Sequence, residues 1–176
     1  MKPANPSLAR WGTTIFTTMS ALAAEHGAVN LGQGFPDEEG PEAIRRVAAE
    51  AVLHGPNQYP PMRGLPALRQ AIAGHDRRRY GLDLDWQREV LVTSGATEAL
   101  AAAFLGLLQP GDEAVLIEPL YDSYLPIIER AGGVARLVRL QPPDWALPRE
   151  ALAAAFSPRT KLMVVNTPLN PAGRVF

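Results

Sequence analysis

The chain has no cysteine among its 176 residues. Disulfide bonds and metal sites built on thiolates are therefore excluded, and the composition suits a reducing compartment. The histidines His26, His54 and His75 stand too far apart in the sequence for metal-ligand spacing, so we expect no metal site.

An excess of charge of one sign is lacking too. The chain carries 17 Lys or Arg against 18 Asp or Glu, and apart from Arg77-Arg78-Arg79 the basic residues are scattered. Because nucleic acids and anionic membranes are bound through basic patches, we expect neither as a partner. The longest apolar run, Ala99 to Leu105, is far shorter than the ~20 residues of a membrane-spanning helix, and residues 1–6 lack the apolar core of a signal peptide. These absences predict a cytoplasmic protein.

The second half of the chain alternates short apolar strands with helices, which is typical of layered α/β folds. The pattern predicts strands at 90–93, 114–117, 134–140 and 162–166 and helices at 97–108, 123–131 and 148–156. The helix at 97–108 is apolar nearly all round, so we expect it to be buried on several sides. The first half predicts helices alone, at 15–25, 41–54 and 66–80, of which the last two end before glycines.

A strand that ends at Thr93 is followed by Ser94-Gly95-Ala96-Thr97 and the start of a helix. A helix start presents backbone N–H groups and the positive end of the helix dipole, an arrangement that binds phosphate. The same residue types are also ordinary helix caps and turn residues, so the residues alone leave both interpretations open. The glycines of Leu31-Gly32-Gln33-Gly34 lack the spacing of a dinucleotide or nucleoside-triphosphate loop.

Five segments occur in a fixed order along the chain. They are Asn30-Leu31-Gly32-Gln33-Gly34-Phe35-Pro36-Asp37, Gln58-Tyr59-Pro60-Pro61, Thr93-Ser94-Gly95-Ala96-Thr97-Glu98-Ala99, Ile117-Glu118-Pro119-Leu120-Tyr121-Asp122-Ser123-Tyr124 and Asn166-Thr167-Pro168-Leu169-Asn170-Pro171-Ala172-Gly173. Together they resemble the amino-terminal half of the class I and II aminotransferases of fold type I, most of all the kynurenine, glutamine and methionine transaminase branch. The resemblance extends from Phe16 to Phe176.

The resemblance implies an incomplete, three-layer α/β large domain of fold type I at residues 41–176, and a preceding arm at 1–40 that belongs to the small domain. It implies pyridoxal phosphate as the cofactor and transfer of an amino group between an amino acid and a 2-oxo acid. It leaves open which amino donor and which 2-oxo acid are used.

The resemblance also implies roles for single residues. Gly95, Ala96 and Thr97 match the turn that holds the cofactor's phosphate. Tyr121 matches the aromatic residue that stacks on the pyridine ring, and Asn170 matches the asparagine that binds the phenolic oxygen.

Three further matches concern the substrate and the partner subunit. Tyr59 matches a tyrosine that reaches the phosphate of the other subunit, which implies a homodimer with shared sites. Gly34 matches the turn beside the substrate carboxylate, and Phe16 matches an aromatic residue near the substrate side chain. Leu169 and Ala172 depart from the family, which commonly has Asn or His at the first position and often Thr at the second; these departures bear on the branch.

A transaminase needs a lysine amine that binds the cofactor covalently, and the chain has only Lys2 and Lys161. Lys161 begins a predicted strand whose other end carries Asn166, about 17 Å away at about 3.3 Å per residue. Because ligands of open α/β sheets sit at the carboxyl ends of the strands, Lys161 lies at the wrong end. We therefore assign no catalytic residue and expect an amino-terminal portion that is inactive alone, whether as a proteolytic fragment or through a broken reading frame.

Two alternatives to a transaminase stay open on the sequence. One is a β-lyase that cleaves carbon–sulfur bonds with the same cofactor and the same fold. The other is a non-catalytic interaction module that retains half of a site, since a fold does not determine a function.

Overall fold

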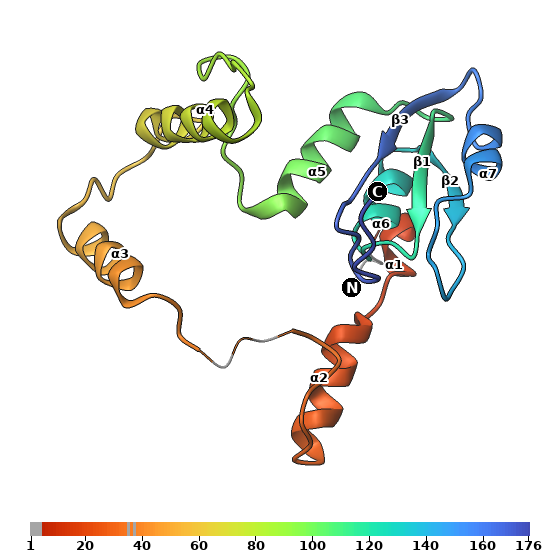
Figure 1. The fold of residues 1–176 in the computed structure, drawn as a ribbon, viewed down its shortest axis with the longest axis horizontal. Coiled ribbons are helices and arrows are strands. Elements are labelled where there is room, and N and C mark those ends of the chain that lie inside the picture. Colours follow the sequence, from red (N-terminus) through yellow and green to blue (C-terminus); the bar gives the residue numbers. More distant parts are fainter. Residues whose placement is uncertain (1–4, 35, 37) are drawn as a thin grey trace. The chain divides into compact units, whose positions relative to one another are not determined.

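The computed structural model describes residues 5–34, 36 and 38–176. The chain forms two compact units, each of which is described by itself: one joins the residues up to Thr14 with Ser94–Phe176, and the other is Ile15–Thr93 (Figure 1). The domain boundary predicted at residue 40 stays a prediction, because these units reflect contacts within this chain alone. No helix in the described ranges is long and apolar enough to cross a membrane.

The first unit is built on a parallel sheet of three strands. β1 (Glu113–Glu118) lies at the centre, between β2 (Val134–Arg139) and β3 (Thr160–Val164). The connections between the strands contain α6 (Tyr124–Arg130) and α7 (Arg149–Ala154). Nearly every residue of β1 is buried, as expected of a central strand that is covered on both faces.

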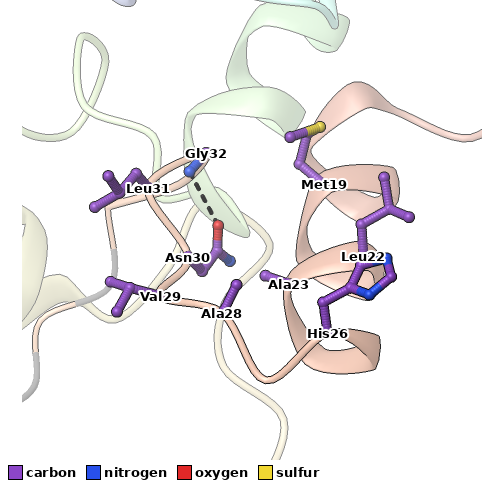
Figure 2. Close-up of a pocket in the computed structure, with 9 residues that line it drawn as sticks. All are labelled: Met19, Leu22, Ala23, His26, Ala28, Val29, Asn30, Leu31 and Gly32. Atoms are coloured by element: carbon purple, nitrogen blue, oxygen red, sulfur yellow. Dashed lines mark hydrogen bonds between the residues drawn. The ribbon is translucent and has the colours of Figure 1, made fainter.

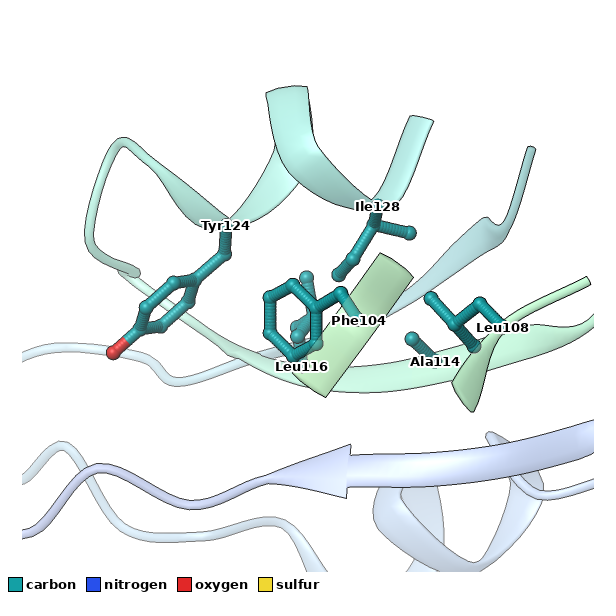
Figure 3. Close-up of a cluster of buried hydrophobic side chains, with 6 residues drawn as sticks. All are labelled: Phe104, Leu108, Ala114, Leu116, Tyr124 and Ile128. Carbon is teal, nitrogen blue, oxygen red and sulfur yellow. The ribbon is translucent and has the colours of Figure 1, made fainter. Parts of the chain in front are cut away.

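One face of this sheet carries the main hydrophobic core (Figure 3). The core brings together β1, α6 and α5 (Gly95–Leu107). Its buried members are Phe104, Leu108, Ala114, Leu116, Tyr124 and Ile128. Full burial of one such large side chain contributes about 1.5–3 kcal/mol, so this cluster is the main source of stability of the unit.

The opposite face of the sheet carries a second, smaller cluster. Side chains alternate between the two faces along a strand, so Ile117 points away from the core that holds Leu116. Ile117 packs with Leu140, which follows β2, and with Leu169, which follows β3. The two clusters together fix the loops at the carboxyl ends of the strands.

The short helix α1 (Pro6–Ala9) and the residues after it belong to the first unit. Arg10 forms an ion pair with Glu129 of α6, and Trp11 Nε1 donates a hydrogen bond to the same carboxylate at 3.1 Å. The start of the described chain is thereby tied to α6.

The second unit contains α2 (Ile15–Glu25), α3 (Glu42–His54) and α4 (Pro66–Tyr80). The start of α4 has proline in its first turn, and its end is capped by Gly81 in the left-handed conformation at φ 70°. Buried Arg69 of α4 donates hydrogen bonds to the backbone carbonyls of Trp86, Gln87 and Val90 and lies 5.3 Å from the Trp86 ring. Arg69 therefore holds the segment 86–90 against α4.

The sequence predicts every helix and strand named above except α1, with ends within two residues of those observed. The strand expected at 90–93 is wrong: these residues form no strand in the described structure, and the Val92 N–H donates to the carbonyl of Arg63 at 3.0 Å. A short apolar run has the same sequence pattern whether it pairs in a sheet or is buried without pairing. Val90 is buried without pairing.

The expected burial of the helix at 97–108 on several sides is also wrong. Phe104 and Leu108 are buried, but Leu105 and Leu107 are 53% and 52% exposed. The reason is that α5 meets β1 and α6 with one face, and the described residues of its unit supply no second layer against the rest of the helix.

The amino ends of the strands are joined by a buried carboxylate. Glu113, at the start of β1, is 1% exposed and accepts hydrogen bonds from Arg136 of β2 at 2.6 Å, from Ser157 Oγ at 2.7 Å and from Arg159 at 2.6 and 3.0 Å. The bonds from Arg136 and Ser157, and then that from Arg159, hold the pKa of Glu113 at about 2. The pKa of Arg136 is raised by the same pair.

We predict that Glu113→Gln lowers the melting temperature at pH 7 and flattens its acid dependence. The folded-state pKa of about 2 lies below the ordinary value of 4.5, so the carboxylate stabilises the fold above about pH 4.5 and loses this effect as the pH falls towards 2. Thermal unfolding followed by circular dichroism between pH 2 and pH 7 measures the difference in melting temperature between the variant and the wild type. This difference should become smaller as the pH falls from 7 to 2. Glu25→Gln, an exposed change of the same charge, serves as the control; a constant difference at every pH would contradict the assignment.

Candidate functional site

Two segments of the first unit leave from one edge of the sheet. Because β1 and β3 are parallel neighbours, the loops that follow them leave from the same edge. Tyr121 lies in the loop after β1, and Asn170 lies in the turn after β3.

The carboxyl end of α5 is fixed at the opposite edge of the sheet. A short loop joins the end of α5 to the start of β1 at Glu113, and the Leu108 side chain lies 3.1 Å from the position of a Cβ built on Gly133, just before β2. The carboxyl end of α5 is therefore at the amino edge of the sheet, and its first turn lies at the other end of a helix that is roughly 20 Å long at about 1.5 Å per residue.

The first turn of α5 is open. Gly95 has φ +81°, a conformation that glycine adopts without strain, and a Cβ added to it would meet nothing within 4 Å. Ala96 and Thr97 are exposed, and helix geometry leaves their N–H groups without an acceptor inside the helix. The Glu98 carboxylate accepts a hydrogen bond from the Ser94 N–H. The turn can therefore donate to an anion through Ala96 and Thr97.

Tyr121 offers a partly buried aromatic ring at this edge. It packs on the main core and lies against Tyr124, with ring centroids 5.9 Å apart and planes at 59°. Tyr124 in turn meets Phe104 edge to face at 6.4 Å and 87°. Burial raises the pKa of Tyr124, and a hydrogen bond with the Asn166 side chain offsets part of this rise.

The turn that carries Asn170 is anchored by a buried side chain and by backbone hydrogen bonds. Leu169 is 3% exposed in the second cluster, and its N–H donates to the carbonyl of Arg174 at 2.7 Å. The Gly173 N–H donates to the carbonyl of Leu169 at 2.6 Å, which closes the turn. Asn170 itself is exposed, so its amide is available to a ligand.

A buried polar atom at the same edge lacks a partner. Within the described residues, Ser123 Oγ is the buried side-chain atom for which no hydrogen bond is found, and it lies in the loop that carries Tyr121. An orphaned hydroxyl of this kind is satisfied in a complete site by a ligand or an ordered water. The edge thus combines a flat ring, an amide and an unpaired hydroxyl, and the first turn of α5 offers anion donors; these groups suit a flat, phosphorylated ligand.

The other predicted site residues belong to the second unit and are described within it. Phe16 is half-buried in α2, Gly34 is exposed with open space around it, and Tyr59 is 98% exposed in the loop before α4. Phe35 and Asp37 of the same motif, and Lys2, lie outside the described residues.

The second unit has a cavity of its own, between α2 and the residues that follow it (Figure 2). Its volume is about 460 Å³. The Asn30 side chain shapes the loop: it accepts a hydrogen bond from the Gly32 N–H and donates one to Ser20 Oγ, both at 3.0 Å. The lining is mostly apolar and consists of Met19, Leu22, Ala23, His26, Ala28, Val29, Asn30, Leu31 and Gly32.

Lys161 is the second residue of β3 and is exposed, so it lies towards the amino edge of the sheet, away from Tyr121 and Asn170. In the part of the chain that the structure describes, no three His, Cys, Asp or Glu side chains gather in a way that could hold a metal ion.

Sequence reasoning gave no role to Tyr124 or Ser123. A signal existed for Tyr124, because it stands three residues after Tyr121 in the sequence. Nothing in the sequence marks Ser123, because its lack of a partner is a property of the packed structure.

Comparisons with known proteins agree with this geometry. The sequence model of the family "Aminotransferase class I and II" matches residues 26–176. A probable N-succinyldiaminopimelate aminotransferase of Mycobacterium tuberculosis is 53% identical over 167 residues, which are 94% of this chain and 42% of that protein. The kynurenine–oxoglutarate transaminase 1 of Homo sapiens is 41% identical over 172 residues, 88% of this chain and 40% of that protein.

A solved structure from Escherichia coli, reported with a methionine aminotransferase function, has a TM-score of 0.93 at 46% identity and covers 100% of this chain and 46% of that one. The chain therefore spans less than half the length of the relatives that it matches.

Proposed function

Because this chain belongs to the class I and II aminotransferases, we propose that the whole protein that contains it binds pyridoxal phosphate and transfers an amino group between an amino acid and a 2-oxo acid. The chain itself is a partial α/β domain of fold type I. The observation that carries the proposal is that Tyr121 and Asn170 stand in the loops that leave one edge of the sheet, while the open first turn of α5 offers donors for an anion.

The start of α5 is proposed to bind the phosphate. The N–H groups of Ala96 and Thr97 and the Thr97 hydroxyl can donate to its oxygens, and the positive end of the helix dipole favours the negative charge. Gly95 supplies the open turn that lets a phosphate approach the backbone. Glu98 carries a negative charge in the same turn. Its carboxylate accepts a hydrogen bond from the Ser94 N–H and is thereby engaged in the helix cap.

Tyr121 and Asn170 are proposed to hold the ring. The Tyr121 ring, backed by Tyr124, stacks on the pyridine face and fixes its plane. The Asn170 amide donates to the phenolic oxygen, which favours the ionised form of that oxygen. Pyridoxal phosphate, when bound, supplies an electron sink for the bond changes at the amino acid's α-carbon.

The remaining assignments come from the second unit. We propose Tyr59 as a donor to the phosphate of the partner subunit in a homodimer, Gly34 as the turn beside the substrate carboxylate, and Phe16 as a neighbour of the substrate side chain. The near-complete exposure of Tyr59 leaves its hydroxyl accessible to another subunit. We also propose a cytoplasmic location, in line with the absence of cysteine.

The relatives named above are aminotransferases, and none of these comparisons supports a carbon–sulfur lyase or a non-catalytic module. The named substrates of the relatives differ from one another, so we assign no particular amino donor.

Tyr121→Leu and Asn170→Ala in the whole protein should separate the two ring contacts. Tyr121→Leu should weaken cofactor retention about fivefold, since aromatic stacking contributes about 1 kcal/mol beyond burial. Asn170→Ala should instead shift the pH titration of the cofactor's visible absorbance, because the phenolic oxygen loses its donor. Equilibrium dialysis and spectrophotometric titration measure these effects; wild-type retention and titration in both variants would refute the assignments.

Mixing two variants should reveal a shared site. Tyr59→Phe and Asn170→Ala are each expected to lower transaminase activity in a homodimer of one variant. A mixed dimer has one site that receives Asn170 from one subunit and an intact Tyr59 from the other, so activity should recover on mixing. The measurement is turnover after refolding the two variants together. If no activity returns although mixed dimers form, Tyr59 acts within its own subunit.

The 176-residue chain alone should form no covalent adduct with pyridoxal phosphate at the sheet edge. Of its two lysines, Lys161 lies on β3 towards the other edge. Borohydride reduction followed by peptide mass spectrometry checks this, with Lys161→Arg as the control for surface labelling. A reduced adduct at Lys161 combined with transaminase turnover would overturn the placement of the site.

A further inference from the structure

We propose that the first unit has a second ligand site, at the carboxyl ends of β1 and β2, which binds a free α-amino acid with an apolar or aromatic side chain. A cavity of about 350 Å³ lies there, and its lining includes Glu118, Arg139 and Trp145. Small-molecule sites measure about 300–1,000 Å³, so the cavity suits one small molecule. None of these three residues is assigned to the cofactor, and the inference does not depend on the proposed function.

A carboxylate and a guanidinium stand side by side in this lining. Glu118 ends β1, and its register partner Arg139 ends β2. Arg139 Nε donates to Glu118 Oε2 at 3.2 Å, and the side chains of Arg139 and Glu118 are 72% and 22% exposed. A guanidinium has further N–H donors on its two terminal nitrogens, and a carboxylate has a second oxygen. Both charged groups can therefore take another partner.

The other carboxylate of β1 shows how a structural ion pair is built in this sheet. Glu113 is 1% exposed and is bonded by two arginines and by Ser157 Oγ. Glu118 is more accessible, and in the residues that the structure describes it pairs with one arginine. An ion pair this exposed contributes little to stability, so the pair at the carboxyl edge is better explained by a ligand than by the fold.

Trp145 is held in an unfavourable backbone conformation at the same cavity. Its φ is 51°, and among the described residues it is the one non-glycine residue with a positive φ. Its N–H donates to the carbonyl of Gln141 at 2.9 Å, and it packs against the second cluster, where Leu140 is 2% exposed. Strained residues of this kind gather at ligand sites, where the surrounding structure holds them in place. The loop after β2 thus fixes an aromatic residue at the cavity.

The charges select the class of ligand. The pair is neutral as a whole, so an anion meets the repulsion of Glu118 and a cation meets that of Arg139. A free amino acid carries both charges: its ammonium group faces Glu118, and its carboxylate meets the guanidinium, whose planar fork suits carboxylates. Its side chain then lies against Trp145 and against Pro119 and Pro142, which also line the cavity. A peptide does not match, because it lacks a free ammonium and a free carboxylate on one carbon.

The test follows the indole N–H signal of Trp145 by nuclear magnetic resonance in the whole protein without added cofactor, titrated with L-phenylalanine. Trp145→Phe identifies the signal. The signal should shift and saturate, and Glu118→Gln and Arg139→Gln should each weaken binding about tenfold or more, because each removes a charge-assisted contact. Arg79→Gln, which removes an exposed charge on α4, is the matched control and should bind like the wild type.

Two analogues of phenylalanine test the need for both charges. Phenylpropanoate lacks the ammonium group and phenylethylamine lacks the carboxylate, so each should bind about tenfold or more weakly than phenylalanine. Binding of either analogue as tight as that of phenylalanine would overturn the amino-acid assignment. A Trp145 signal that does not move at millimolar phenylalanine, or that moves equally in Glu118→Gln and Arg139→Gln, would overturn the site.

Transaminase turnover separates this site from the proposed cofactor edge. Arg139→Gln should lose phenylalanine binding at the Trp145 signal and keep wild-type turnover. A loss of turnover in proportion to the loss of binding would place Arg139 in the reaction site and overturn a separate pocket. If the wild-type protein shows no transaminase activity, the proposed function fails, and the titration still decides whether the pocket binds an amino acid.

Discussion

The buried carboxylate of Glu113 is the interaction on which the first unit depends. A charge this deeply buried is tolerated only when it is paired and hydrogen-bonded, and here the partners come from β2 and from the residues just before β3. The three strands are therefore held together at their amino ends. Because they are parallel, a fixed amino edge also fixes the register of the carboxyl edge, where the candidate site lies.

The direction of α5 and the parallel strands arrange the elements of the candidate site. α5 ends at the amino edge of the sheet, and the loops after β1 and β3, which carry Tyr121 and Asn170, leave from the carboxyl edge. Under the proposed function, the first turn of α5, Tyr121 and Asn170 would hold the phosphate, the ring and the phenolic oxygen of pyridoxal phosphate.

Local signals predicted most of the fold. The bounds of α4 follow from Pro66 and Gly81, and the alternation of strands and helices predicted the α/β sheet. The strand predicted at 90–93 and the burial predicted for α5 were wrong, because composition does not say which neighbours a segment will meet. The residues of the sheet edge came from the resemblance to a family, whereas Glu113 was missed, because its role arises from partners that are distant in the sequence.

Leu169 gives the turn of Asn170 an apolar anchor where the family commonly has asparagine or histidine. The anchor lies with Ile117 and Leu140 on the face of the sheet opposite the main core. Apolar packing responds to side-chain volume and is insensitive to salt and pH, so the position of the Asn170 amide is governed by the shape of a pocket beneath the sheet. Under the proposed role of Asn170, the electronic setting of the cofactor would then depend on the size of residues that never touch it.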